Sequence, residues 1–221
     1  MSNEVRTPIT QAMKEGALSR GELKELMRRS NKPALKRIVI WIALLSFTSY
    51  LIWLSMGTWF LFPAMFIHGI IIVHHFSLQH ECCHYTAFKT RKLNDIIGHL
   101  CGFSIILPHQ HFRYEHCDHH TYTNLKGKDP ELITLPISVY KYLWYISAFS
   151  YWKNKFSEIF RHLFGKLSDD EKVFIPKQEK NTIFKEARIM VFLYLLIFII
   201  CVLTNFWAPL WFWILPLFRI I

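Results

Sequence analysis

The longest uncharged run of the sequence reads IVIWIALLSFTSYLIWLSMGTWFLFPAMFIHGIIIVHHFSLQ, residues 38–79. A helix of about 20 residues crosses a hydrocarbon core roughly 30 Å thick, so this run has room for two transmembrane helices. We place these helices at residues 38–56 and 59–78, joined by a turn at residues 55–57. A helical hairpin of this kind satisfies every backbone polar group internally, which lipid requires. The run therefore predicts an integral membrane protein.

Beyond the hairpin, a second uncharged run covers residues 189–218. We expect a third span at residues 187–206, followed by a turn around Asn205 and Pro209, because proline does not continue a helix. Residues 210–221 are too few to cross a membrane, and we interpret them as the start of a fourth span that the end of the sequence cuts off. The predicted fold is all-α: a hairpin, a third span and a partial fourth span in the membrane.

The charges are segregated into blocks, and only 19% of the residues are charged while 52% are hydrophobic. Residues 1–37 form a basic segment, and the connection between the hairpin and the third span is rich in lysine. Basic loops stay in the cytosol, so both segments and the N-terminus are predicted to be cytosolic. We divide the chain into this N-terminal segment and a membrane domain of residues 38–221 that is incomplete at its C-terminal end. Topology explains the net charge of +10, and nucleic acid is not an expected partner.

Part of the basic segment, residues 14–29, carries leucines among its charges. This pattern fits a helix lying on the membrane surface, where its apolar side enters the headgroup layer. A solvated helix leading into the first span fits equally well. Both interpretations predict one continuous helix here.

Histidine is concentrated in one part of the chain, because eleven of the twelve histidines lie between His68 and His120. His80 and His84 are four residues apart, which places their imidazoles about 40° apart on one helix face. The pair follows the end of the second predicted span, at the cytosolic surface. A single pair with this spacing is often ordinary surface chemistry, so its meaning depends on the second cluster.

The second cluster is His116, His119 and His120. On a helix, the imidazoles of His119 and His120 point to either side of the His116 direction, so all three face one sector. Together the two clusters offer five nitrogen donors, more than one tetrahedral zinc ion uses, and two metal ions become plausible. Imidazole-rich sites with room for O2 suit iron, and spacing alone leaves copper, zinc and manganese open. The sequence therefore predicts a non-haem metal site on helices at the cytosolic surface.

Carboxylates next to these histidines are candidates for orienting the imidazoles, by accepting a hydrogen bond from the ring nitrogen that does not bind the metal. Glu81 and Asp118 are the main candidates, with Glu115 as a third. For each of them, a solvent-exposed carboxylate without a role at the site, on a basic cytosolic surface, is a nearly equal alternative. The cysteines inside the two clusters, Cys82, Cys83 and Cys117, turn away from the ligand face and are expected to be buried, reduced thiols.

The remaining histidines are interpreted as structural. His68, His74 and His75 are out of phase with His80 and are expected to be buried in the bundle or hydrogen-bonded. A second set is assigned to packing or surface roles, and it comprises His99, His109, His111 and His162. Within that set, His109 shares the face of His116 if the helix starts at Pro108.

Two short signals indicate helix starts in the cytosolic region. Asn94 and Asp95 precede the apolar run 96–107, which is too short to span and predicts a helix lying in the interface, capped by this Asn-Asp pair. Asp129 followed by Pro130 also reads as a cap with proline at the first helical position.

Taken together, these motifs resemble the membrane fatty acid desaturase family. The resemblance rests on His80-x-x-x-His84, a spacer with Leu93-Asn94-Asp95, Phe112-Arg113-Tyr114-x-His116-x-x-His119-His120 and Lys128-Asp129-Pro130-Glu131-Leu132. It implies that His80, His84, His116, His119 and His120 are iron ligands of a di-iron centre. It further implies that O2 is the co-substrate, that a lipid acyl chain is oxidised, and that a ferredoxin-like or cytochrome-like donor with its reductase supplies electrons.

The sequence departs from that family in one respect. The family has a third histidine box, another His-x-x-His-His after a fourth span, and this sequence contains none. Residues 211–221 resemble the start of that fourth span, so we expect a truncated product or a fragment. A catalytically incomplete metal-binding fragment is therefore one alternative function, and a lipid hydroxylase with related boxes is another.

A third alternative comes from the first pair itself. His80-Glu81-Cys82-Cys83-His84 matches the His-Glu-x-x-His pattern of zinc metalloproteases, in which Glu81 is the general base acting on zinc-bound water. A protease needs one further ligand and has no use for the packed second cluster, so this alternative is the weakest.

Overall fold

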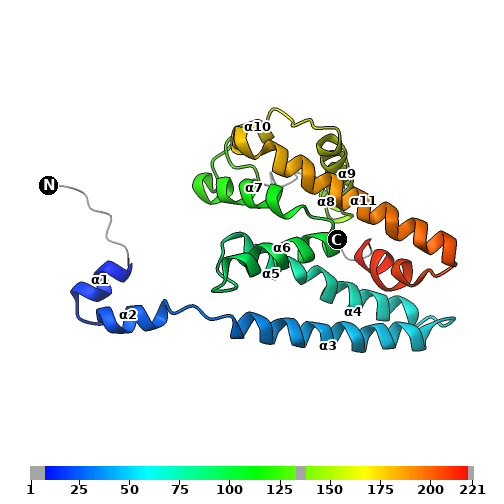
Figure 1. Ribbon diagram of the computed structural model, residues 1–221, viewed down its shortest axis with the longest axis horizontal. Helices are drawn as coiled ribbons and strands as arrows, with labels where there is room; N and C mark the ends of the chain where they lie inside the picture. Colours follow the sequence, from blue (N-terminus) through cyan, green and yellow to red (C-terminus); the bar gives the residue numbers. More distant parts are fainter. Residues whose placement is uncertain (1–7, 133–137, 219–221) are drawn as a thin grey trace.

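The computed structural model describes residues 8–132 and 138–218, and within these ranges all regular structure is helical (Figure 1). Three segments are long and apolar enough to cross a membrane: Lys32–Ser55, Leu61–Cys83 and Lys177–Thr204. They correspond to the three predicted spans, so the all-α membrane fold class is confirmed.

The predicted hairpin consists of α3 (Lys32–Ser55) and a second arm in two pieces, α4 (Leu61–Val73) and α5 (His75–Cys83). Its turn contains Gly57 with a φ of 78°, a left-handed conformation that glycine adopts without steric cost. The helix α3 begins six residues before the predicted span, because Lys32 to Arg37 continue the helix through the charged layer. Figure 1 shows the two arms of the hairpin side by side.

The third span is α11 (Lys180–Thr204), which ends at Asn205 with a φ of 53°. Asparagine tolerates this left-handed conformation, so the predicted turn is confirmed. The chain then folds back through the π-helix η2 (Leu210–Ile214) and α12 (Leu215–Phe218), and Phe212 and Leu215 pack against Met65 of α4. The last residues of the predicted partial fourth span, 219–221, lie outside the described residues.

The prediction of one helix over residues 14–29 is wrong. Two short helices, α1 (Pro8–Lys14) and α2 (Arg20–Leu26), flank a turn in which Gly16 has a φ of 74°. A capping box at Ser19 starts α2, because its hydroxyl accepts from the Glu22 amide while the Glu22 carboxylate accepts from the Ser19 amide. The turn at Gly16 and the cap at Ser19 therefore divide into two helices the segment for which the leucine spacing predicts one.

Two further helices follow the hairpin in the chain, namely α6 (Arg91–Ile105) and α7 (His109–Tyr122). The predicted cap at Asn94 and Asp95 is wrong, since α6 starts three residues earlier. Asn94 is buried inside the first turn, where its amide side chain accepts from the Phe88 amide and donates to the Phe88 carbonyl. It anchors the preceding loop rather than the helix end.

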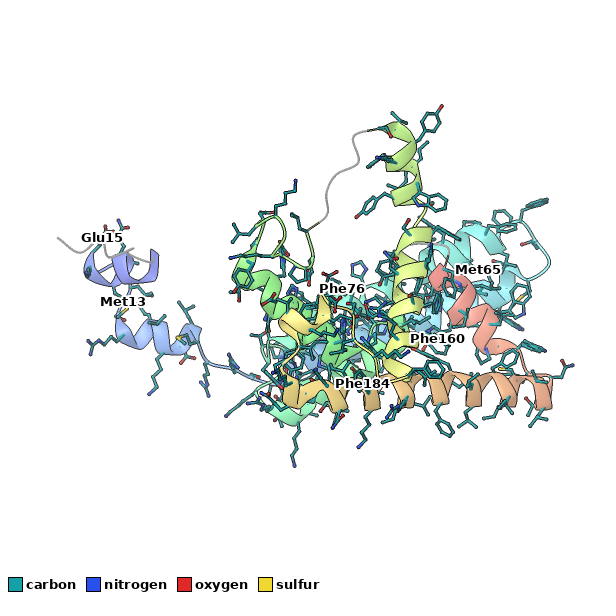
Figure 2. All side chains as sticks on the ribbon, turned by 90° about the horizontal axis from the view of Figure 1, so that it is seen from above. Met13, Glu15, Met65, Phe76, Phe160 and Phe184 are labelled. Atoms are coloured by element: carbon teal, nitrogen blue, oxygen red, sulfur yellow. The ribbon has the colours of Figure 1, made fainter. Side chains whose placement is uncertain are left out.

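The cover, the part of the chain between the second and third spans that packs over α7, consists of α8 (Val139–Ile146), α9 (Phe149–Leu163), the short α10 (Glu171–Phe174) and the 3-10 turn η1 (Lys177–Glu179). The helix α7 contacts both α10 and α11, while α9 packs on α11. Figure 2 shows α8 projecting from the body beyond α9. This arrangement encloses α7, the helix that carries the second histidine cluster, between the hairpin and the cover.

Candidate metal centre

The predicted histidine pair meets two members of the predicted second cluster where α5 leaves the span and contacts α7. One ring nitrogen from each of His80, His84, His116 and His120 lies within 4.8 Å of the others. His116 is buried, His80 and His84 are half-buried, and His120 is exposed. The site therefore forms at the surface end of the second span, with one side open.

Ring positions show that the four imidazoles converge. The centroid of His116 lies 4.4 Å from that of His80, 5.0 Å from His84 and 4.5 Å from His120. The Nε2 atoms of His116 and His120 are only 3.0 Å apart. Donor atoms at this separation fit two ligands of one ion, because metal–imidazole bonds of about 2.0–2.1 Å place such donors about 3.3 Å apart in a tetrahedral site.

A carboxylate that contacts His116 Nδ1 fixes the ring in an orientation suited to metal binding. His116 Nδ1 lies 2.8 Å from the Glu131 carboxylate, so Nδ1–H donates and Nε2 keeps its lone pair for an ion. Burial lowers the pKa of His116, although Glu131 opposes this effect. Burial and the neighbouring imidazoles also lower the pKa of His84. Both rings are thereby kept in the neutral form that metal binding needs.

His119 is placed apart from the other four. Its ring centroid is 5.6 Å from that of His116, and its Nδ1 lies 2.8 Å from Asp129. That hydrogen bond raises the pKa of His119. The buried Asp129 carboxylate also accepts from the backbone amides of Asn124 and Glu131. Asp129 is thus the centre of a loop, and the predicted helix start at Asp129 and Pro130 is wrong.

The two carboxylates predicted to orient the ligands, Glu81 and Asp118, make contacts elsewhere. Glu81 pairs with Arg37 at 2.6 Å, and Asp118 lines a cavity on the far side of α7. The carboxylates that accept hydrogen bonds from the imidazoles of the second cluster are Glu131 and Asp129, which sequence reasoning missed in this role. Both residues belong to the Asp129-Pro130-Glu131 motif of the sequence, but only the folded loop brings their carboxylates next to the histidines of α7.

Three histidines predicted to be structural are confirmed as hydrogen-bonded within the bundle. His68 contacts Thr48 Oγ1 at 2.6 Å and the Phe212 carbonyl at 2.8 Å. His74 and His75 each lie within 3.0 Å of a carbonyl oxygen of the preceding turn. They therefore stabilise the hairpin rather than extend the site.

The later histidines divide into two kinds. His109 is buried beside Arg113, whose Nη2 is 2.9 Å from its Nε2, and it does not join the site despite sharing a helix with His116. His111 and His162 were assigned to packing or surface roles, yet they form a buried group with Glu171 on the opposite side of α7. No sequence signal linked them, because 51 residues separate the two histidines.

The cysteines confirm the prediction in part. Cys82 and Cys83 are buried free thiols, as expected. Cys117 is exposed, so that part of the prediction is wrong.

A cavity of about 660 Å³ adjoins the four-histidine site. Phe112 lines it and stacks on His116 with centroids 5.1 Å apart, and Phe76 lines it next to His80. Figure 2 marks Phe76 within the body of the molecule. Apolar side chains form most of its wall, including Val73, Ile105, Leu107 and Leu132, and Glu131 is among the polar groups. The arrangement places an apolar slot beside a cluster of metal-binding donors.

Comparisons with known proteins agree with this geometry. A family model described as Fatty acid desaturase matches residues 53–221. An omega-6 fatty acid desaturase, chloroplastic, of Spinacia oleracea is 33% identical over 90 residues, covering 39% of this chain and 20% of that protein. An sn-1 oleoyl-lipid 12-desaturase of Anabaena variabilis is 34% identical over 77 residues, covering 34% and 22%.

A further relative is an sn-1 acyl-lipid omega-3 desaturase (ferredoxin) of a Synechocystis species, 32% identical over 94 residues, which cover 41% of this chain and 26% of that protein. The matched segments therefore span between a fifth and about a quarter of these relatives' length. No solved structure matches the chain.

Proposed function

Because the chain belongs to the fatty acid desaturase family, we propose that it takes part in the O2-dependent desaturation of a lipid acyl chain at an iron site. The observation that supports this proposal most strongly is the convergence of His80, His84, His116 and His120 beside an apolar cavity. The named activities of the matched relatives, acyl-lipid desaturases, agree with it.

The donor set fits iron. Four neutral imidazoles suit iron, copper and zinc alike, so the family relationship selects iron among the metals that the site accepts. When bound, iron would supply the oxidising power that an unactivated C–H bond requires, drawn from O2. His119 is the fifth proposed ligand, with its Nε2 freed by the Nδ1 contact to Asp129. Its separation from the other four fits a second ion.

The chain's own residues position the substrate and the ligands. Phe76 and Phe112 form an apolar wall between the cavity and the imidazoles, which would hold methylene groups next to the site and exclude water. Glu131 holds the proton on His116 Nδ1 and so keeps that imidazole in the ligand tautomer. Electrons would come from a separate ferredoxin-like or cytochrome-like donor with its reductase, and one matched relative carries ferredoxin in its name.

The site is proposed to face the cytosol together with the N-terminus. The basic residues of segment 1–37 and of the connection before α11 lie at the ends of the spans that carry the site. A lipid hydroxylase would use the same groups. The zinc protease alternative is disfavoured, because the required base Glu81 is engaged by Arg37.

The test of this proposal is the iron content of detergent-purified protein, measured by elemental analysis beside a His116→Ala, His120→Ala variant. We expect iron in the parent protein and its loss from the variant, because two of the four convergent donors are gone. A His99→Gln variant is the matched control, since that histidine pairs with Glu186 outside the site. Iron that is absent from the parent, or unchanged in the double variant, contradicts the proposal.

A catalytically incomplete metal-binding protein remains the alternative that the sequence raised. It is separated by a second measurement, the conversion of acyl chains in membranes that contain the protein and a reduced ferredoxin. Iron binding together with new double bonds supports the desaturase, whereas iron binding without them supports the metal-binding alternative.

A further inference from the structure

A second group of metal-binding donors lies on the other side of α7. His111 is five residues before His116, which turns its side chain about 140° from the first site. It meets His162 of α9 and Glu171 of α10, and one donor atom of each lies within 4.8 Å of the others. All three residues are buried. Three helices that are separate in the sequence therefore contribute one donor each.

Distances within the group match a coordination site. Glu171 Oε1 lies 3.2 Å from His162 Nε2 and 3.7 Å from His111 Nε2. Tetrahedral zinc with bonds of about 2.0–2.1 Å holds its donors about 3.3 Å apart. The two imidazole centroids are 5.0 Å apart. The three donors thus surround a point at which one ion fits without rearrangement of the helices.

The imidazole nitrogens of this group need a partner. None of the four ring nitrogens of His111 and His162 makes a hydrogen bond of good geometry within the described residues. The two side chains are 1% and 0% exposed. A buried polar atom without a partner is unfavourable, and an ion bound between the two Nε2 atoms would supply a partner to both.

Charged side chains surround the group. Glu158 Oε1 is 3.3 Å from His111 Nδ1. A carboxylate near Nδ1 is the usual partner of a histidine that binds metal through Nε2. Lys155 pairs with Glu158, and Arg161 Nη2 is 2.6 Å from Glu171 Oε1, so these two carboxylates are matched by two cations. A bound ion would therefore not meet an excess of positive charge.

The protonation states also suit a ligand set. Burial lowers the pKa of His111 to about 4, so its ring is neutral near pH 7. Burial acts to raise the pKa of the Glu171 carboxyl group. The nearby His162 side chain and the Ser168 amide together have the larger, opposite effect, and the pKa is lowered to about 2. A carboxylate oxygen has lone pairs for both the Arg161 hydrogen bond and an ion.

We infer that His111, His162 and Glu171 form a second metal site, separate from the histidine boxes, that binds a divalent transition metal of the zinc class. Two imidazoles and one carboxylate are a donor set that zinc accepts, with a fourth position for water. A cavity of about 520 Å³ lined by His111 and Glu171 supplies room for that water. The ion ties the cover helices α9 and α10 to the helix that carries the boxes.

The test separates this site from the first one. In full-length protein carrying His84→Ala and His120→Ala, zinc is measured by elemental analysis after dialysis against a weak chelator. We expect about one zinc per chain, and a loss of affinity on the order of 100-fold or more when Glu171→Gln or His162→Gln is added, since even the loss of a residue that only hydrogen-bonds to a ligand costs about 10–100-fold. His99→Gln added to the same background is the matched control. No zinc in the background protein, or zinc unchanged by both added substitutions, overturns the inference.

A second variant distinguishes the loss of a metal ligand from a loss of the folded structure. His162→Cys keeps a donor at the position, and a thiolate binds zinc and cobalt well. With cobalt(II) added to the same background, we expect a new sulfur-to-cobalt charge-transfer absorption band that the background protein lacks. Retained zinc together with this band supports the site, whereas zinc bound without the band places the ion elsewhere and overturns the inference.

Discussion

At the scale of single residues, the orientation of the imidazoles depends on carboxylates outside the histidine clusters. Glu131 accepts a hydrogen bond from His116 Nδ1–H, and Asp129 accepts one from His119 Nδ1–H. Both belong to the loop after α7, and Asp129 holds that loop by accepting two backbone amides. The ring orientation of the second cluster is therefore set by a segment 10 to 15 residues away in the chain.

This dependence gives a prediction for Glu131. We expect Glu131→Ala to lower iron affinity about 10–100-fold, because His116 loses the partner that fixes its tautomer and orientation. Glu131→Gln keeps an acceptor for Nδ1–H and is expected to lose less. Competition with a coloured iron chelator measures both. Glu81→Gln is the matched control, since Glu81 pairs with Arg37; an equal loss in this control would show that Glu131 has no special role.

At the scale of elements, close packing of α6 depends on two glycines one turn apart. A Cβ at Gly98 would lie 2.2 Å from the His109 ring, and one at Gly102 would lie 2.3 Å from the Leu107 carbonyl oxygen. Small residues with this spacing let helix backbones approach closely. They allow α6 to pack on α5 and on the start of α7, which sets the distance between the two histidine clusters.

Gly102→Ala is accordingly expected to destabilise the protein by about 1–3 kcal/mol, the usual cost of overpacking. The added methyl group meets backbone, which yields less easily than a flexible side chain. Thermal unfolding in detergent measures the change. Gly21→Ala is the control, because Gly21 lies in α2 with only the Ser19 hydroxyl near it, at 3.9 Å. Equal stability of the two variants would contradict the packing argument.

The same elements show what the sequence predicted and what it did not. The three spans and the convergence of four histidines followed from hydropathy and from helical spacing, which are local properties. The start of α6 and the loop role of Asp129 were missed because distant partners decide them: Asn94 binds the Phe88 backbone, and Asp129 binds His119. His111 and His162 were missed for the same reason, since only the packing of both α7 and α9 on α11 brings them together.

At the scale of the whole molecule, the hairpin turn and the metal site lie at opposite ends of the second span. The proposed orientation puts the turn on the outer side of the membrane and the site on the cytosolic side. In a Cys117→Ser background, we expect a membrane-impermeant maleimide to label Thr58→Cys in intact cells. Lys126→Cys is expected to react only after the membrane is opened. Labelling with the opposite pattern would reverse the proposed orientation.

The length of that second span has a consequence for where the site sits. Leu61–Cys83 comprises 23 residues, which corresponds to a helix about 34 Å long. A hydrocarbon core about 30 Å thick leaves roughly one turn beyond it, and that last turn carries His80. Thicker bilayers draw this turn inward and thinner ones release it, at a cost of fractions of a kcal/mol per Å. The depth of the metal relative to the lipid chains is therefore set jointly by the protein and by membrane thickness, which changes with the chain length and unsaturation of the lipids around it.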